Sequence, residues 1–325
     1  MKFRTEIEND NRFQGLITHD RPIVMVGSCF SYNIGGCLRQ RLFDVTVNPL
    51  GTLYNPLSIA SSIEHIVDSR KFDDSDMFHD GQLWHSFHCH SMFSSHDKYD
   101  VIQRMNESVS TANISLANAS VLILTLGTTR VFNLKETGET VANCHKQPSS
   151  LFNERYITLD ETTSTLKKII QRVRKLNNEI KIIFTVSPVR HPGNSLHADR
   201  LSKSTLMLGI ENVIDESDGI LYFPAYEIMV DDLRDYRFYA DDMRHPSTVA
   251  IQYIYSRFED MYFSDETRIS ASTCEKFTRR LSHRFMTDNT LAMERFNCET
   301  EKLENQLIST YPYIEYALYK FKQKQ

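Results

Sequence analysis

The apolar residues of the first 260 positions form short unbroken runs separated by stretches with helical spacing. Such runs indicate strands that are buried on both faces. Between them, apolar residues recur every three or four positions, which is typical of helices that bury one face. Strands alternating with helices predict parallel βαβ units in a three-layer α/β fold. The expected sheet has about five strands, at residues 23–26, 43–47, 121–126, 181–186 and 219–223.

The pattern changes within the chain and again near its end. Residues 133–153 contain Gly138 and Pro148, which favour a hairpin or loop inserted into the α/β pattern. Beyond Ser264 the strand runs stop, and the spacing predicts two or three helices. We therefore expect an α/β domain over residues 1–262 and a small helical appendage over residues 263–325. The tyrosine-rich stretch 311–319 is expected to pack on the body, with a partner surface as the alternative.

Composition narrows the class of protein. Lys and Arg total 37 and Asp and Glu total 42, giving a net charge of −5, so we expect no nucleic-acid partner. No run reaches the ~18 apolar residues of a membrane span, and the chain begins with polar sequence rather than an apolar leader. The six cysteines include no Cys-x-x-Cys pair, which argues against a disulfide framework or a zinc knuckle. We expect a cytoplasmic protein with reduced thiols.

A candidate nucleophile follows the first predicted strand in the stretch Gly27-Ser28-Cys29-Phe30. Open α/β sheets bind ligands beyond the carboxyl ends of their strands. A hydroxyl at Ser28 would lie near a helix N-terminus, where free N–H groups stabilise negative charge. Helix capping is the alternative role of Ser28, and Cys29 is the rival nucleophile. If Ser28 faces the crevice, Cys29 is expected to pack inward.

A candidate base and its orienting acid occur in Asp242-Met243-Arg244-His245-Pro246, just before an amphipathic helix. A carboxylate three residues before a histidine on a tight loop is able to accept the Nδ1–H bond, which leaves Nε2 free to take a proton. A solvated loop is the alternative interpretation of this motif alone. Together with Ser28, the pair supplies nucleophile, base and orienting acid at opposite ends of one α/β unit.

Backbone groups at other strand ends are candidate donors for an oxyanion hole. These are the N–H groups of Ser28, of Gly51 after the second strand, and of the turn Gly127-Thr128-Thr129 after the third. The sequence has no G-x-S-x-G elbow, phosphate loop or dinucleotide fingerprint, so we expect no nucleotide cofactor, and no other cofactor is indicated.

Several long motifs, in order, resemble those of the GSCFA family. They include GSCFS at 27–31, NPLGTLYNP at 48–56, WHSF at 84–87, LTLGT at 124–128, VANCHK at 141–146, FTVSPVRH at 184–191 and YRFYADD at 236–242. The likeness spans about residues 1–262. The fifth residue of the family's eponymous motif is Ala, whereas this chain has Ser31.

The GSCFA family resembles the SGNH or GDSL hydrolases. That resemblance implies a flavodoxin-like fold, with Ser28 as nucleophile, His245 as base and Asp242 as the acid that orients it. Gly51 would be an oxyanion donor. Where SGNH enzymes have Gly-x-Asn with an amide donor, this chain has Gly127-Thr128-Thr129.

Histidines and arginines near strand ends are candidate substrate contacts. His191 and Arg190 follow the fourth predicted strand, and Arg is able to bind a carboxylate or phosphate in bidentate fashion. His85 and His145 are further candidates for the pocket lining. The histidine-rich segment 79–96 fits no standard zinc spacing, so we expect no metal site there.

The sequence predicts a serine hydrolase that cleaves an ester, such as an O-acyl group on a carbohydrate or small metabolite. Acyl transfer to a hydroxyl acceptor by the same residues is one alternative. A binding module that keeps the fold without turnover is the other, because Thr129 stands where the amide donor is expected.

Overall fold

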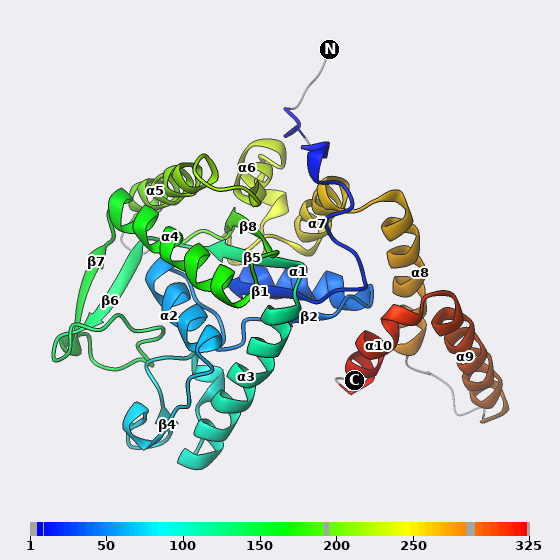
Figure 1. Cartoon of the computed structure of the whole chain (residues 1–325), viewed down its shortest axis with the longest axis horizontal. Helices are drawn as coiled ribbons and strands as arrows, with labels where there is room; N and C mark the ends of the chain where they lie inside the picture. Colours follow the sequence, from blue (N-terminus) through cyan, green and yellow to red (C-terminus); the bar gives the residue numbers. More distant parts are fainter. Residues whose placement is uncertain (1–4, 9, 192–194, 284–289, 324–325) are drawn as a thin grey trace.

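A five-stranded parallel sheet forms the centre of the protein (Figure 1). The computed structural model describes residues 5–8, 10–191, 195–283 and 290–323. The strand order β2-β1-β5-β8-β9 is, in chain order, the 2-1-3-4-5 arrangement of flavodoxin-like sheets, which reverses between β1 and β5. The predicted fold class is therefore confirmed. The strands are β1 (Ile23–Gly27), β2 (Val45–Val47), β5 (Val121–Leu126), β8 (Lys181–Val186) and β9 (Ile220–Phe223).

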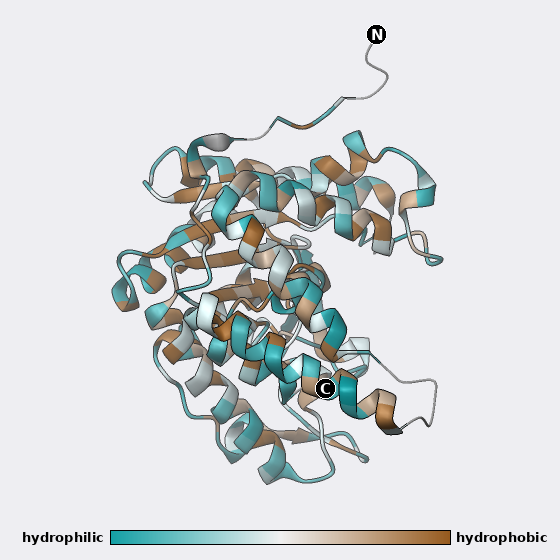
Figure 2. Cartoon of the chain, turned by 90° about the vertical axis from the view of Figure 1, so that its right-hand side faces the viewer, coloured by the Kyte–Doolittle hydropathy of each residue, from teal (hydrophilic) through white to brown (hydrophobic). Residues whose placement is uncertain are grey.

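Helices cover both faces of this sheet, so the apolar strands lie between two layers with polar outer surfaces (Figure 2). Alternate residues of β1 face opposite cores: Val24 and Val26 join one cluster, Ile23 and Met25 the other. One layer comprises α2 (Pro56–Val67), α3 (Lys98–Asn118), α4 (Leu159–Leu176) and α5 (Leu196–Ile214). The other comprises α1 (Cys29–Gln40), α7 (Thr248–Tyr262) and the short α6 (Ala225–Glu227) with the π-helical turn Ile228–Asp232. No helix within the described ranges is both long enough and apolar enough to cross a membrane.

Two hairpins extend from the sheet. β6 (Arg130–Leu134) pairs antiparallel with β7 (Phe152–Tyr156), so the predicted excursion is a hairpin whose arms reach beyond residues 133–153. The smaller hairpin, β3 (Phe78–His79) with β4 (Trp84–His85), lies within the histidine-rich segment. The β6–β7 hairpin directly follows β5, whereas the β3–β4 hairpin lies in the connection between α2 and α3 (Figure 1). They place loops around the carboxyl ends of the central strands.

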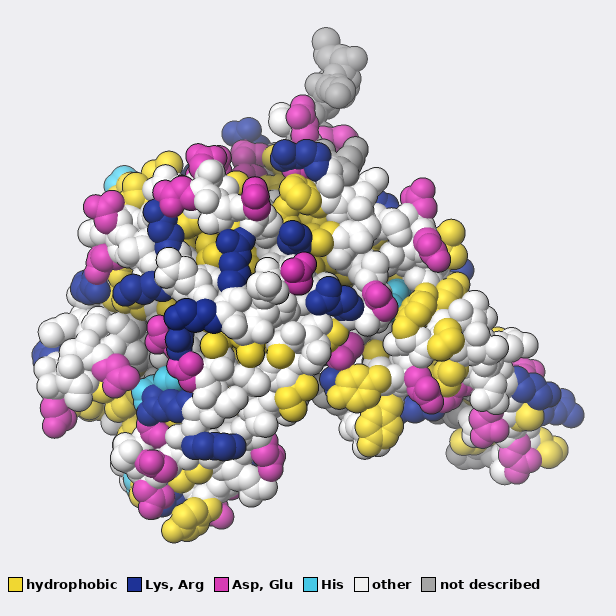
Figure 3. Space-filling view, in the orientation of Figure 1, with side chains coloured by type: hydrophobic (Ala, Val, Ile, Leu, Met, Phe, Trp, Pro, Cys, Tyr) yellow, Lys and Arg dark blue, Asp and Glu magenta, His cyan; other side chains and the backbone are white. Residues whose placement is uncertain are grey.

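Three helices follow the α/β unit: α8 (Asp265–Leu281), α9 (Thr290–Thr310) and α10 (Glu315–Lys322). Their apolar residues meet Leu42, just after α1, in a separate cluster that includes Phe277, Leu307 and Leu318. Part of the tyrosine-rich stretch packs on the body, as expected. Ile314 and Leu318 are buried, whereas Tyr316 and Tyr319 are 56% and 61% exposed. Figure 3 shows apolar side chains at the surface of the C-terminal helices.

Candidate active site

A cavity of about 540 Å³ opens at the carboxyl ends of β1, β5 and β8. It lies where the strand order reverses, which is the usual ligand position in sheets of this topology. Its lining comes from the start of α1, the segment before α2, the loop after β5 with the β6–β7 hairpin, the loop after β8, the first turns of α5 and the loop before α7. Segments far apart in the sequence thus meet at one site.

The turn between β1 and α1 requires glycine at position 27. Gly27 has φ +145°, and a Cβ there would lie 2.2 Å from the Thr125 carbonyl oxygen. The two strand ends are therefore in close contact. Ser31, where the family motif has Ala, is buried and donates from Oγ to Thr125 Oγ1 at 2.9 Å.

Ser28 is fully buried and serves as the N-cap of α1. Its Oγ accepts the Phe30 N–H at 3.3 Å and donates to Ser187 Oγ at 3.0 Å. Ser28 does not line the cavity, but Cys29 does. The expectation that Ser28 faces the crevice is therefore wrong, because its side chain folds back to cap the helix. Cys29 packs against the hydrophobic core, as expected, but it also lines the cavity.

Asp242 and His245 adopt the predicted arrangement. Asp242 Oδ2 lies 2.5 Å from His245 Nδ1, and Oδ1 accepts the backbone N–H groups of Arg244 and His245 at 2.9 and 3.0 Å. Met243 adopts φ +56°, which tightens the loop between them. Hydrogen bonds from His245 and Arg244 hold the pKa of Asp242 well below its usual range. His245 lines the cavity, with its second ring nitrogen not engaged by Asp242.

The predicted oxyanion donors are all engaged elsewhere. Ser28 N donates to Thr125 O at 3.0 Å, and Gly127 N and Thr128 N both donate to Tyr54 O, at 2.7 and 3.0 Å. Thr129 N donates to Ser202 Oγ at 2.6 Å. Gly51 N closes its own turn on Asn48 O at 2.8 Å, and the residue packs against His90 rather than the cavity. None of these N–H groups is therefore free to stabilise an oxyanion in this structure.

Asn55 is a donor that the sequence reasoning did not assign to the site. Its Oδ1 caps α2 by accepting Ser58 N–H at 2.9 Å, and the residue lines the cavity. The described part of the chain offers no hydrogen-bond partner to its Nδ2 group. The Asn-Pro sequence indicated a helix cap but not this second role. Cys29 begins α1 and lines the cavity, so its backbone N–H is a second candidate donor.

Lys203, on the buried face of α5, supports the wall of the cavity. Its Nζ is fully buried and donates to the carbonyl oxygens of Gly127, Ser187 and Val189 at 2.7, 2.8 and 3.1 Å. Burial lowers the pKa of Lys203 to about 8, so the ammonium form predominates at neutral pH. This cation joins the loops after β5 and β8 and places positive charge behind the site.

His191 and Arg190 line the cavity as expected. His191 N–H donates to Asp199 Oδ1 at 3.0 Å, while its buried Nε2 has no hydrogen-bond partner among the described residues. Burial lowers the pKa of His191 to about 3, so its ring is neutral. Arg190 Nε donates to Tyr239 OH at 3.3 Å.

His85 and His145 do not line the cavity, which corrects that expectation. Both are buried, with ring centroids 4.7 Å apart. His85 Nε2 lies 2.9 Å from Asp80 Oδ2, and His145 Nε2 lies 2.8 Å from Ser86 O. His85 thus contacts the turn of its own hairpin, and His145 joins the segment between β6 and β7 to the segment after β4.

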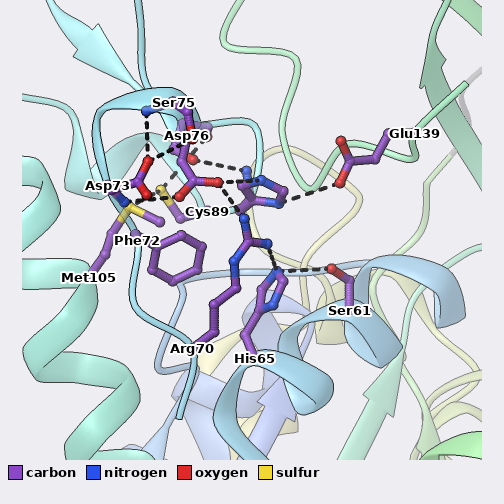
Figure 4. A network of polar contacts seen from close by, with 12 residues as sticks. Ser61, His65, Arg70, Phe72, Asp73, Ser75, Asp76, Cys89, Met105 and Glu139 are labelled. Atoms are coloured by element: carbon purple, nitrogen blue, oxygen red, sulfur yellow. Dashed lines mark hydrogen bonds and ion pairs between the residues drawn. The ribbon is translucent and has the colours of Figure 1, made fainter. Parts of the chain in front are cut away.

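His88 and Cys89 of the histidine-rich segment belong to a cluster of contacts around Arg70 and Asp76. Arg70 lies between Asp76 and His65 (Figure 4). Its Nη2 donates to Asp76 Oδ1 at 2.5 Å, and its Nη1 lies 3.4 Å from His65 Nε2. His88 Nε2 lies 3.3 Å from Asp76 Oδ1, and Cys89 is buried against Met105. Among the residues that the structure describes, no group of three or more His, Cys, Asp or Glu side chains is placed to hold a metal ion.

A comparison with solved structures gave matches of low sequence identity. A carbohydrate esterase of family 3 from Talaromyces cellulolyticus is 8% identical over 74% of this chain and 95% of its own, with a TM-score of 0.39. A family 3 carbohydrate esterase from Clostridium thermocellum is 12% identical over 77% and 98%, with a TM-score of 0.36. The acetyl xylan esterase Est2A from Butyrivibrio proteoclasticus is 10% identical over 75% and 64%, with a TM-score of 0.38.

A comparison with curated proteins gave no significant match. The family comparison is decisive for classification, because the matched region contains the sheet, the cavity, Cys29 and the Asp242–His245 pair. The model of the GSCFA family matches residues 22–258, and the chain therefore belongs to the GSCFA family.

Proposed function

We propose that this protein hydrolyses acyl esters in the cavity at the carboxyl ends of β1, β5 and β8. The observation that carries the proposal is the contact of 2.5 Å between Asp242 Oδ2 and His245 Nδ1 at the wall of that cavity. It fixes the ring so that Nδ1 carries a proton and Nε2 is the accepting nitrogen. The β1–α1 turn supplies the nucleophile, and carries a hydroxyl at Ser28 and a thiol at Cys29.

The reaction proceeds through an acyl-enzyme. His245 takes the proton of the nucleophile and returns it to the leaving alcohol, and Asp242 stabilises the cation that forms on the ring between these steps. Water then attacks the acyl group with His245 again as the base. Asn55 Nδ2 and Cys29 N–H are the donors proposed to stabilise the oxyanion.

The substrate class we propose is an O-acylated carbohydrate or small metabolite. A cavity of about 540 Å³ accepts a ligand of that size. Its lining includes Arg190 and Arg244, for which the described residues provide no carboxylate partner, so an ester that carries an anionic group would find a counter-charge.

The test compares hydrolysis of p-nitrophenyl acetate by the wild type, His245→Gln and Asp242→Asn. Loss of base catalysis lowers kcat by ~10²–10⁴-fold. Asp80→Asn is the matched control, because Asp80 also accepts two backbone N–H groups and contacts a histidine, His85, away from the cavity. Equal activity of Asp242→Asn and Asp80→Asn would contradict the proposal.

A further inference from the structure

We propose that Cys29, rather than Ser28, is the nucleophile of this site, so that the acyl-enzyme is a thioester. This inference rests on the proposed function and identifies its reactive atom. The site would then accept acyl groups from oxygen esters. It would accept them more readily from thioesters, because the thiolate that leaves a thioester is similar in stability to the Cys29 thiolate that replaces it. The protein would be a thiol-dependent acyl hydrolase.

Position is the first argument. Cys29 is the first residue of α1 and its side chain lines the same cavity as His245. Ser28 has no exposed surface, and its Oγ is held between Phe30 N–H and Ser187 Oγ. For Ser28 to attack a substrate, its side chain must leave both partners and uncap the helix, whereas Cys29 needs no rearrangement of the cap.

The electrostatic environment of Cys29 is the second argument. Burial raises the pKa of its thiol, so the thiol is protonated at rest and must lose its proton to a base during attack. The backbone N–H groups of Cys29 and Phe30 and the charge of Lys203 act in the opposite direction and stabilise the developing thiolate. Asp242 raises the pKa of the thiol, as expected for a carboxylate close to it.

His245 is the base that fits this requirement. His191 shares the cavity, but burial lowers its pKa to about 3, which makes its ring a poor proton acceptor. His245 instead has its Nδ1 held by Asp242, and its ring is half exposed, so that a cation on it is solvated as well as paired.

The steps balance without a further reagent. The Cys29 thiol gives its proton to His245 Nε2 as its sulfur bonds to the acyl carbon. The C–O bond to the leaving group then breaks, and the proton passes from His245 to that oxygen, which releases an alcohol. Water attacks the thioester, gives a proton to His245, and the C–S bond breaks. The products are a carboxylic acid and the thiol of Cys29, reprotonated by His245.

The kinetic test uses p-nitrophenyl acetate with Cys29→Ala, Ser28→Ala and the exposed control Cys298→Ser. We expect Cys29→Ala to lower kcat by at least about 100-fold and Ser28→Ala by less than about tenfold, since the latter removes only a helix cap. Cys298→Ser should match the wild type. Thermal unfolding of each variant establishes that it is folded.

A second measurement reads the chemical class of the acyl-enzyme. In the wild type the acyl adduct should be a thioester, which neutral hydroxylamine cleaves. In Cys29→Ser a hydroxyl takes the place of the thiol, so any acyl adduct should be an oxygen ester that resists neutral hydroxylamine. Full activity of Cys29→Ala with loss in His245→Gln would overturn the assignment of Cys29 and leave the esterase intact. No turnover and no adduct in the wild type would overturn both.

Alkylation by iodoacetamide supplies an internal comparison. Cys144 lines the same cavity and its thiol pKa is also raised by burial, but it is not at a helix N-terminus. We expect Cys29 to react faster than Cys144 and His245→Gln to slow Cys29 alone. Equal alkylation rates of Cys29 and Cys144, both unchanged in His245→Gln, would contradict the proposal that His245 activates the Cys29 thiol.

Discussion

The buried lysine behind the cavity gives the most quantitative prediction. In Lys203→Met the aliphatic stem is replaced at similar volume, but the three carbonyl oxygens of Gly127, Ser187 and Val189 lose their shared donor. Each unpaired buried carbonyl costs ~1–3 kcal/mol, or ~3–9 kcal/mol together. In the wild type, however, burial of the Lys203 charge lowers the free energy of unfolding and offsets part of this stabilisation.

That opposing cost follows from the pKa of Lys203. Lowering the pKa from 10.5 to about 8 corresponds to about 3 kcal/mol, at ~1.4 kcal/mol for each pKa unit. The central expectation for Lys203→Met is therefore a decrease of about 3 kcal/mol in the free energy of unfolding. The variant should also lose ester hydrolysis, because the loops that carry Gly127 and Val189 lose their common anchor.

Urea unfolding followed by far-UV circular dichroism measures this difference. Lys167→Met is the matched control: Lys167 pairs with Glu216 at the surface, and its loss should change the free energy of unfolding by less than ~1 kcal/mol. A decrease in Lys203→Met no larger than in Lys167→Met would refute the reasoning.

The same lysine predicts a pH dependence. The folded pKa is below the unfolded value, so between about pH 8 and pH 10.5 the unfolded chain holds a proton that the folded chain has released. The free energy of unfolding of the wild type, minus that of Lys203→Met, therefore rises with pH across that window and is constant below it. The comparison of urea midpoints at pH 7 and pH 9.5 measures it, and a difference that falls with pH would contradict this assignment.

Two further variants test the site and the turn. Asn55→Ala should lower kcat for ester hydrolysis by ~10²-fold through loss of an oxyanion donor. Thr158→Ala removes the cap of α4 and should only decrease the free energy of unfolding by ~1 kcal/mol. Equal kcat values in the two variants would contradict the role of Asn55. Gly27→Ala should abolish folding, because its Cβ would lie 2.2 Å from Thr125 O, while Gly36→Ala meets no atom within 4 Å and should raise the unfolding midpoint. Soluble, cooperatively unfolding Gly27→Ala would disprove the close contact.

The sheet was predictable from sequence because its strands are buried on both faces and therefore read as continuous apolar runs. One of the covering helices, α5, has only a weak amphipathic pattern. In α5 the reason is physical: Asp199, Ser202 and Lys203 occupy its buried face because they hold the cavity wall, and they interrupt the apolar stripe. A helix that supports a polar site loses the periodicity by which helices are recognised.

The two halves of the site differed in predictability for a similar reason. The Asp242–His245 contact joins residues three positions apart, so the motif contains most of its geometry. The burial of the Ser28 side chain depends instead on its cap bond and on a hydrogen bond to Ser187, after β8. Likewise, the Gly127 N–H is unavailable because it contacts Tyr54, from a segment over 70 residues earlier. Such long-range bonds leave no local sequence pattern.

The central claim is that one side chain of the β1–α1 turn carries the acyl group during turnover. The most direct measurement is peptide mass spectrometry of wild-type protein that is quenched with acid while it hydrolyses p-nitrophenyl acetate. The account predicts one acetyl group, on Cys29, which is absent from His245→Gln treated in the same way. An acetyl group on Ser28 would contradict the thiol assignment, and acetylation confined to surface lysines would contradict the acyl-enzyme itself.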